Sequence, residues 1–299
     1  MKTIISFLFI FISQIAAGSI DAESAIGSRA FSLGQSATVS YSDILNSINN
    51  PASLYYSKSF NTSFFYSEPF NDTQNYSLGF TIPTKNYGTF GFRYFNFTVN
   101  NLVERNVNGE KTGLFSFRQN EYVISYGFQL YDKVTFGFNA KWLTENFPDL
   151  NTCEFQSDHT GIDLSFALFP DFANDILKNM GLGIVLKNLI QANDNNDHLP
   201  KGIVVLAENG YKISSHSIFV VMNYMWYEGT LNKYQRRIHF GLEYGYDFTF
   251  FRIGYNDDMF SVGTGIHYKY FSINYGYGEY FKNFYGKSSI HNFGLNIEI

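Results

Sequence analysis

Residues that could do chemistry are sparse in this 299-residue sequence, in which Asp, Glu, Lys and Arg together make up 16%. The chain contains no Gly-x-Ser-x-Gly elbow, no phosphate-binding glycine loop and no His-Glu-x-x-His. His239 and Glu243 are four residues apart, but on an extended strand this spacing separates their side chains by roughly 13 Å. The sequence therefore predicts no catalytic residues, and we expect a protein that is not an enzyme.

Metal-binding residues are equally few. Cys153 is the single cysteine, so the chain can form neither an intramolecular disulfide nor a thiolate metal site. Asp194, Asp197 and His198 lie close together in the sequence, but their spacing does not match a calcium-binding loop. We interpret that segment as a solvated loop and expect no metal and no cofactor.

Six ionisable side chains stand out because they alternate with large apolar residues. Period-two spacing puts them on the face of an extended segment opposite to the apolar side chains. One interpretation is an internal network of salt bridges and hydrogen bonds, and the other is a path for a substrate or an ion. We favour the network for these residues, which are Arg93, Lys141, Asp163, His239, Glu243 and His267.

The segments that carry these residues share one pattern from about residue 61 onward. Large apolar residues alternate with small or polar ones, and the chain contains 33 Phe and 23 Tyr. At 122–129, for example, Tyr, Ile, Tyr and Phe alternate with Val, Ser, Gly and Gln. Such alternation is typical of strands with one apolar and one polar face. A soluble β-sandwich is one alternative, because its strands alternate as well.

The length and the apolar face of these strands favour a membrane barrel. Segments of about 9 to 13 residues match a tilted bilayer crossing. Lipid cannot satisfy unpaired backbone groups, so such strands must close into a ring. The sequence therefore predicts an all-β fold, a transmembrane antiparallel β-barrel of about 14 strands formed by residues 59–299, in the bacterial outer membrane. The predicted strands are 61–69, 74–83, 87–99, 119–131, 133–146, 157–169, 180–190, 200–208, 214–228, 233–247, 249–256, 259–268, 270–279 and 288–298.

The predicted connections alternate in length. Several joints after even-numbered strands are very short, with the exception of 170–179, whereas joints after odd-numbered strands include the long segments 100–118, 147–156 and 191–199. Short periplasmic turns and longer external loops alternate in this way when both termini lie on the periplasmic side. A net charge of −5 argues against a nucleic-acid partner.

The residues before the strands fall into two segments. Residues 1–18 have the features of a secretory signal peptide, with Lys2, an apolar run and small residues near Ala17. Residues 19–58 are predicted to form a partly helical plug, because fourteen strands enclose more space than their own side chains fill. Within it, Asp43 is expected to cap a short helix, and Asn50 to cap a turn that begins at Pro51. The alternative for 19–58 is a periplasmic lead-in to the barrel.

The same N-terminal segment carries a recognisable motif. The stretch GSRAFSLGQSATVSYSDILNSINNPASL resembles the amino-terminal pattern of the PorV/PorQ family of FadL-like outer-membrane proteins. It departs from that pattern at Ser28, in lacking a second glycine after Gly34, and in having no acid directly after Asp43. The matching positions are Gly27, Arg29, Ala30, Leu33, Gly34, Asp43, Asn50, Pro51, Ala52 and Leu54.

This resemblance implies an accessory role in type IX protein secretion and surface attachment. The partners would be outer-membrane lipid, secretion components and cargo proteins. A FadL-like channel for the uptake of hydrophobic small molecules is the alternative, and it would bind a hydrophobic ligand. That alternative requires apolar residues on the inward face of neighbouring strands. Mainly Gly, Ser, Asn and charged residues occur there, with exceptions such as Phe95 and Val123, so the sequence favours the secretion role.

Overall fold

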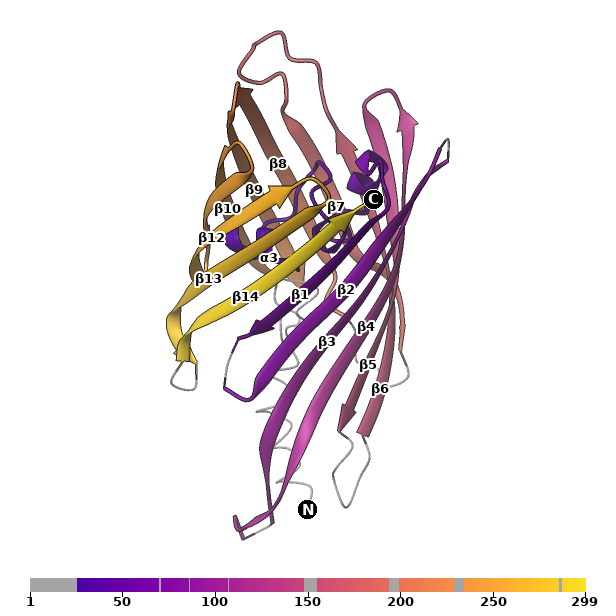
Figure 1. The fold of residues 1–299 in the computed structure, drawn as a ribbon. Coiled ribbons are helices and arrows are strands. Elements are labelled where there is room, and N and C mark those ends of the chain that lie inside the picture. The colour runs from indigo at the N-terminus through magenta and orange to yellow at the C-terminus, as the bar shows by residue number, and fades with distance from the viewer. Residues whose placement is uncertain are drawn as a thin grey trace.

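Fourteen antiparallel strands close into a barrel in the computed structural model, which describes residues 26–69, 71–85, 87–106, 108–147, 155–193, 199–228, 234–284 and 287–299 (Figure 1). Three short helical elements come first: α3 (Ser28–Ser32), α4 (Ile44–Ser47) and the 3₁₀ helix η1 (Pro51–Tyr56). The strands are β1 (Asn61–Glu68), β2 (Thr73–Thr84), β3 (Gly88–Arg105), β4 (Lys111–Tyr131), β5 (Val134–Phe147), β6 (Phe155–Leu168), β7 (Gly181–Asn193), β8 (Gly202–Ile213), β9 (His216–Glu228), β10 (Tyr234–Tyr246), β11 (Thr249–Asn256), β12 (Met259–Tyr268), β13 (Phe271–Phe284) and β14 (Lys287–Glu298).

Each strand pairs with its sequence neighbours, and β1 closes the ring by pairing with β14 as well as β2. The predicted fold class is therefore confirmed. A closed barrel with an apolar outer face is the architecture of bacterial outer-membrane proteins, in agreement with the predicted location. No helix among the described residues is long and apolar enough to cross a bilayer.

The two faces of the strands differ as the alternation predicts. On β4, Tyr122 and Ile124 are 40% and 59% exposed, whereas Val123 and Ser125 are fully buried. Aromatic side chains also meet across neighbouring strands on the outside, as in the ring contacts of Tyr94 with Tyr122, 5.1 Å between centroids. The outward face is therefore the one that meets lipid, and the inward face surrounds the lumen.

The predicted connection 100–118 was wrong, because most of it is strand. β3 continues to Arg105 and β4 begins at Lys111. The register between β3 and β4 shifts between Val99 and Leu102, where Asn101 has a φ of 58°. One extra residue on β3 exchanges its inward and outward positions, so the alternation in the sequence is interrupted although the strand continues.

The two ends of the barrel differ in their connections. One end, here the turn end, carries the chain terminus Ile299 and four two-residue turns at 132–133, 214–215, 247–248 and 269–270 (Figure 1). Each of these turns contains a residue with positive φ, namely Lys133, Ser214, Asp247 and Lys269. The opposite end, the loop end, carries the tip of the long β3–β4 hairpin. The predicted signal peptide, Cys153 and the Asp194–His198 cluster lie outside the described residues.

Candidate functional site

Residues 26–56, named here the lumenal segment, lie inside the barrel rather than beside it (Figure 1). Its elements contact different parts of the wall: α3 packs against β11 to β14, α4 against β1 to β3, and η1 against β3 to β6. The four apolar residues of the N-terminal motif, Ala30, Leu33, Ala52 and Leu54, are completely buried. The segment therefore spans the lumen from one side of the ring to the other.

Local signals in the sequence explain the helical elements of the lumenal segment. The Asp43 carboxylate accepts a hydrogen bond from the backbone N–H of Asn46 and so caps α4 as predicted. Pro51 stands at the start of η1, where its missing N–H costs nothing. Asn50 does not cap η1 through its side chain, which instead donates to the carbonyl of Thr38. That bond ties two parts of the segment together.

Polar side chains of the wall satisfy the irregular backbone of the lumenal segment. Asn223 on β9 bonds both the N–H and the carbonyl of Ala37, at 2.7 and 3.0 Å. The Glu208 carboxylate on β8 accepts from the N–H groups of Val39 and Ser40. A buried backbone without such partners would be strongly destabilised. These contacts explain why polar residues recur on the inward face of the strands.

Glycines on the inward face let the lumenal segment approach the wall closely. A Cβ at Gly254 would lie 1.9 Å from the backbone nitrogen of Gly34, and one at Gly137 would lie 2.2 Å from the carbonyl carbon of Pro51. Gly34 itself has a φ of 71°, a conformation that favours glycine. Small residues on the polar face therefore make room for this segment rather than for water.

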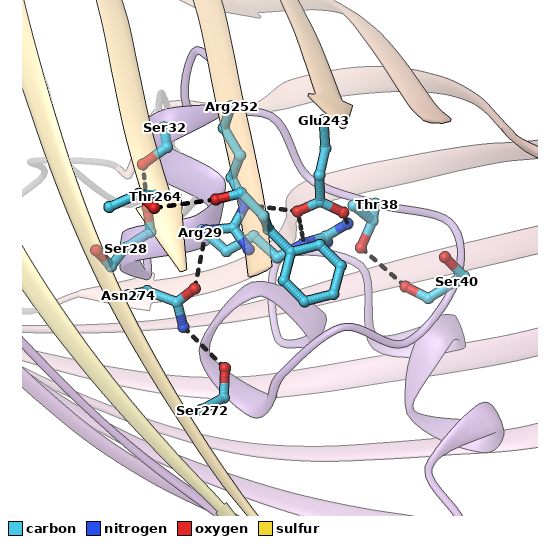
Figure 2. Close-up of polar contacts among 11 residues, drawn as sticks. Ser28, Arg29, Ser32, Thr38, Ser40, Glu243, Arg252, Thr264, Ser272 and Asn274 are labelled. Atoms are coloured by element: carbon cyan, nitrogen blue, oxygen red, sulfur yellow. Dashed lines mark hydrogen bonds and ion pairs between the residues drawn. The ribbon is translucent and has the colours of Figure 1, made fainter. Parts of the chain in front are cut away.

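An ion cluster joins the lumenal segment to the wall at the side of β10 and β11 (Figure 2). Arg29 of α3 donates from Nε and Nη2 to the two carboxylate oxygens of Glu243, each at 2.9 Å. Arg252 on β11 donates from Nε to Glu243 at 2.5 Å and from Nη1 to Asn274 at 2.8 Å. The guanidinium of Arg29 also lies 4.9 Å from the ring centroid of Phe219. One carboxylate thus holds two guanidinium groups.

The pKa values of two ionisable groups of the lumenal segment, Arg29 and Asp43, are affected by this cluster. Burial by itself would lower the pKa of Arg29, but the ion pair with Glu243 outweighs burial and raises that pKa above its ordinary value. Burial raises the pKa of the Asp43 carboxyl, opposed by its bond from Asn46 and by the nearby charge of Arg29. Arg29 is therefore a permanent cation in the lumen.

The other predicted inward charges form pairs along the wall. Nζ of Lys141 on β5 lies 2.9 Å from Oδ1 of Asp163 on β6. Nη2 of Arg93 on β3 lies 2.6 Å from Oε2 of Glu121 on β4. In both pairs the side chains are almost completely buried. Such pairs agree with the network interpretation.

The two histidines have different surroundings. His239 on β10 is fully buried, with its Nδ1 2.7 Å from the carbonyl oxygen of Gly34. His267 on β12 is exposed and lines a cavity at the turn end. The structure therefore brings Glu243 and His239 to the lumenal segment but does not bring the two together as a catalytic pair.

That cavity has a volume of about 200 Å³ and lies next to the ion cluster. Polar side chains dominate its lining, which includes Arg29, Ser42, Arg252, His267, Asn274 and Asn296. His267 and Ser272 lie opposite each other on β12 and β13, and no hydrogen bond joins their side chains in the described part of the chain. The polar lining is suited to hydrogen bonding with a polar group.

An inward aromatic cluster was missed in the sequence analysis. Five phenylalanines of β1, β3 and β4 pack against Ile44, Leu45 and Leu54 of the lumenal segment and form one buried group, which we call the aromatic cluster: Phe65, Phe95, Phe97, Phe115 and Phe117. Of these only Phe95 had been noticed. Phe115 and Phe117 alternate with Leu114 and Ser116, but they fall in the stretch interpreted as a loop.

Arg252, Glu208 and Asn223 were also missed as lumenal residues. All three occupy inward positions of strands that the sequence analysis had found, although β8 continues to Ile213, beyond the predicted end at 208. Their period-two position could have found them, but not their partners. Glu208 and Asn223 bond residues of the lumenal segment that are 168 to 186 residues away in the chain, and Arg252 bonds Glu243 and Asn274 of neighbouring wall strands.

Comparison with solved structures identifies the same fold in two toluene transporters and a FadL homologue. The toluene transporter TbuX of Ralstonia pickettii superposes with a TM-score of 0.60 at 12% identity, over 94% of this chain and 100% of that one. The toluene transporter TodX of Pseudomonas putida gives 0.61 at 11% identity, over 92% and 97% of the two chains. A FadL homologue of Pseudomonas aeruginosa gives 0.55 at 9% identity, over 90% and 97%.

At these identities the likeness establishes the fold, a FadL-type barrel. The chain matches no protein family model and no curated protein. The coarser part of the expected resemblance, to FadL-like barrels, is thus confirmed at the level of fold. The PorV/PorQ assignment continues to rest on the N-terminal motif alone.

Proposed function

We propose that this chain is an outer-membrane channel for small hydrophobic molecules, in which the lumenal segment acts as a plug. The first support is the fold shared with TbuX and TodX, which are described as toluene transporters. The second, and the observation that carries the proposal, is the aromatic cluster. It supplies the inward apolar surface that a hydrophobic channel needs and that the sequence analysis did not find.

The aromatic cluster lies where a hydrophobic solute entering from the loop end would meet the plug. Phe97 and Phe117 face each other across β3 and β4, with ring centroids 6.3 Å apart in an edge-to-face arrangement. Val99 and Leu102 extend the apolar surface along β3 toward the loop end, and Ile44 and Leu45 extend it into the plug. Aromatic and aliphatic walls of this kind are typical of sites for apolar ligands.

The experiment measures toluene uptake by cells that lack their own hydrocarbon channel and express this chain. Replacing Phe97 and Phe117 together by Ser removes apolar contact from the inward face. We expect uptake to fall severalfold, because each buried aromatic side chain contributes about 2 kcal/mol of apolar transfer free energy. The matched control is Phe251→Ser, since Phe251 is 58% exposed on the outward face.

Surface expression and heat-modifiable electrophoretic mobility show that each variant has folded. Uptake that is the same in the double variant, the control and the parent would contradict the proposal. Uptake by cells that express the parent chain equal to uptake by cells without the chain would also contradict the proposal. Loss of surface-attached proteins on gene deletion, with toluene uptake unaffected, would instead support the secretion role. No contact among the described residues favours that role.

A further inference from the structure

The connection between β6 and β7 differs from its counterparts at the turn end. Residues 169–180, named here the β6–β7 segment, join these strands, whereas four other joints at this end are two-residue turns. Residues 171–179 are all exposed, and they include the apolar side chains Phe172, Ile176 and Leu177. Ile176 is 70% exposed. Single exposed apolar residues are ordinary, but three of them so close together indicate a contact surface.

The β6–β7 segment lies against the outward face of the wall. Asn209 on β8 donates from Nδ2 to the carbonyl oxygen of Ile176 at 2.7 Å, and Asn179 donates from Nδ2 to the carbonyl oxygen of Gly210 at 2.8 Å. Glu208 points into the lumen, where it bonds the lumenal segment. The side chain of Asn209, the next residue of the strand, therefore points outward, and the backbone at Ile176 lies outside the barrel with it.

The outward side chains around Asn209 belong to the lipid-facing surface. On β8 the exposed outward residues on either side of Asn209 are Val205 toward the loop end and Tyr211 and Ile213 toward the turn end. Tyr211 is opposite Ile218 of β9, which is also exposed. An unpaired amide side chain on such a surface would be costly in lipid, and the bond to the Ile176 carbonyl removes that cost. The contact therefore lies within the apolar band of the wall.

The composition of the β6–β7 segment suits the boundary between acyl chains and headgroups. The N–H of Ile176 donates to Oδ1 of Asn174 at 2.8 Å, and the N–H of Leu177 donates to the carbonyl of Asn174 at 3.0 Å. These bonds satisfy backbone groups that lipid could not satisfy. Nζ of Lys178 lies 3.6 Å from Oδ1 of Asp175, and both side chains are exposed. Such charged groups remain hydrated at the headgroups while apolar neighbours reach the acyl chains.

We propose that the β6–β7 segment anchors the turn end of the barrel in the bilayer, with Ile176 and Leu177 among phospholipid acyl chains. The occupant of this surface is lipid because the segment continues the outward face that the barrel already turns to the membrane. The bond from Asn209 holds the segment at that face. This inference rests on the barrel and its outward face alone, so it does not depend on the proposed hydrophobic channel.

The test places a nitroxide spin label at position 176 of the full chain in vesicles of phosphatidylethanolamine and phosphatidylglycerol. Its collision rates are measured with oxygen, which concentrates among acyl chains, and with a water-soluble nickel chelate present on both sides. Cys153→Ser removes the single cysteine, and Ile176→Cys introduces the labelling site. We expect an oxygen-to-nickel ratio several times that of Asn108→Cys at the exposed tip of the β3–β4 hairpin. It should be close to the ratio of Phe251→Cys on the outward face of β11.

Asp175→Cys carries the same label one residue away and should give a lower ratio, because this side chain is expected at the headgroups. Equal ratios at 175 and 176 would show that the label itself enters the bilayer, and a ratio at 176 like that of Asn108→Cys would place the segment in water. A label at 176 that neither oxygen nor nickel reaches would show that protein, such as a second copy of the chain, covers the segment. Each of these three results overturns the proposal. Heat-modifiable electrophoretic mobility shows that every labelled variant has folded.

Discussion

Several buried charges among the described residues of this barrel form ion pairs with an opposite charge. Glu243 is the centre of the clearest case, because both Arg29 and Arg252 depend on it. A buried ion pair contributes little compared with a well-packed apolar pair, but removal of one partner leaves an uncompensated charge. Loss of Glu243 should therefore cost more stability than its ion pairs contribute, because two buried guanidinium groups would remain without their carboxylate.

At the residue scale we predict that Glu243→Gln destabilises the protein by about 3 kcal/mol or more, since two buried guanidinium groups would repel each other without the carboxylate. The free energy of unfolding in urea, measured in detergent micelles, checks this. The matched control is Glu110→Gln at the exposed tip of the β3–β4 hairpin, which should change the free energy by less than about 0.5 kcal/mol. Equal effects of the two substitutions on the free energy of unfolding would show that the ion cluster does not contribute to stability.

The strands and the lumenal segment, our proposed plug, fit each other closely in shape. The inward glycines of β10 to β14 receive α3, and those of β2 to β5 receive α4 and η1. Wall and plug thus fit because the strands lack side chains where the plug backbone passes. This matching is the reason for a polar face that is rich in small residues.

A side chain added at such a contact should displace the plug. We predict that Gly254→Ala raises single-channel conductance in planar bilayers, because its Cβ would lie 1.9 Å from the Gly34 nitrogen and the backbone cannot yield by that amount. Gly210→Ala is the control, since a Cβ there would meet only the Phe219 ring at 3.7 Å. If both variants conduct like the parent, the plug tolerates crowding and the close approach has no gating role.

The whole molecule combines two partly independent structures, the closed barrel wall formed by the fourteen strands and the lumenal segment inside it. Backbone hydrogen bonds between neighbouring strands complete the wall without the lumenal segment. The lumenal segment has hydrogen bonds within its short helical elements, but the stretch between α3 and α4 relies on wall side chains such as Glu208 and Asn223. The barrel should therefore stay folded without the lumenal segment, whereas the lumenal segment should not keep its structure without the barrel.

At the scale of the molecule we predict that removal of residues 20–56, with the signal peptide retained, gives a folded barrel with a large, water-filled conductance. It should also unfold more readily in detergent, because the ion pair at Glu243 and the buried contacts of α4 and η1 are lost. Conductance measurements and melting curves followed by electrophoretic mobility check both parts. A truncated chain that conducts and melts like the full chain would contradict the plug.

Much of the wall could be predicted from residues near each other in the sequence. The alternation at Tyr122 to Gln129 places the side chains of that part of β4, and the same pattern on other strands places Arg93, Lys141, Asp163, His239 and Glu243 inside. The one large error, the stretch 100–118, arose where the extra residue near Asn101 exchanged the two faces of β3. Phe115 and Phe117 keep their alternation on β4, but they lie in the stretch interpreted as a loop, and so the evidence for a hydrophobic route was missed.

The sequence by itself determined the closed barrel and the inward position of its charges, because period-two alternation is a local property of extended chains. Only the tertiary structure decided which inward residues meet. Arg29 reaches Glu243 across 214 residues of sequence, and the aromatic cluster unites β1, β3 and β4 with the plug. These meetings depend on ring closure, strand register and the path of the plug, none of which is encoded in the spacing of neighbouring residues.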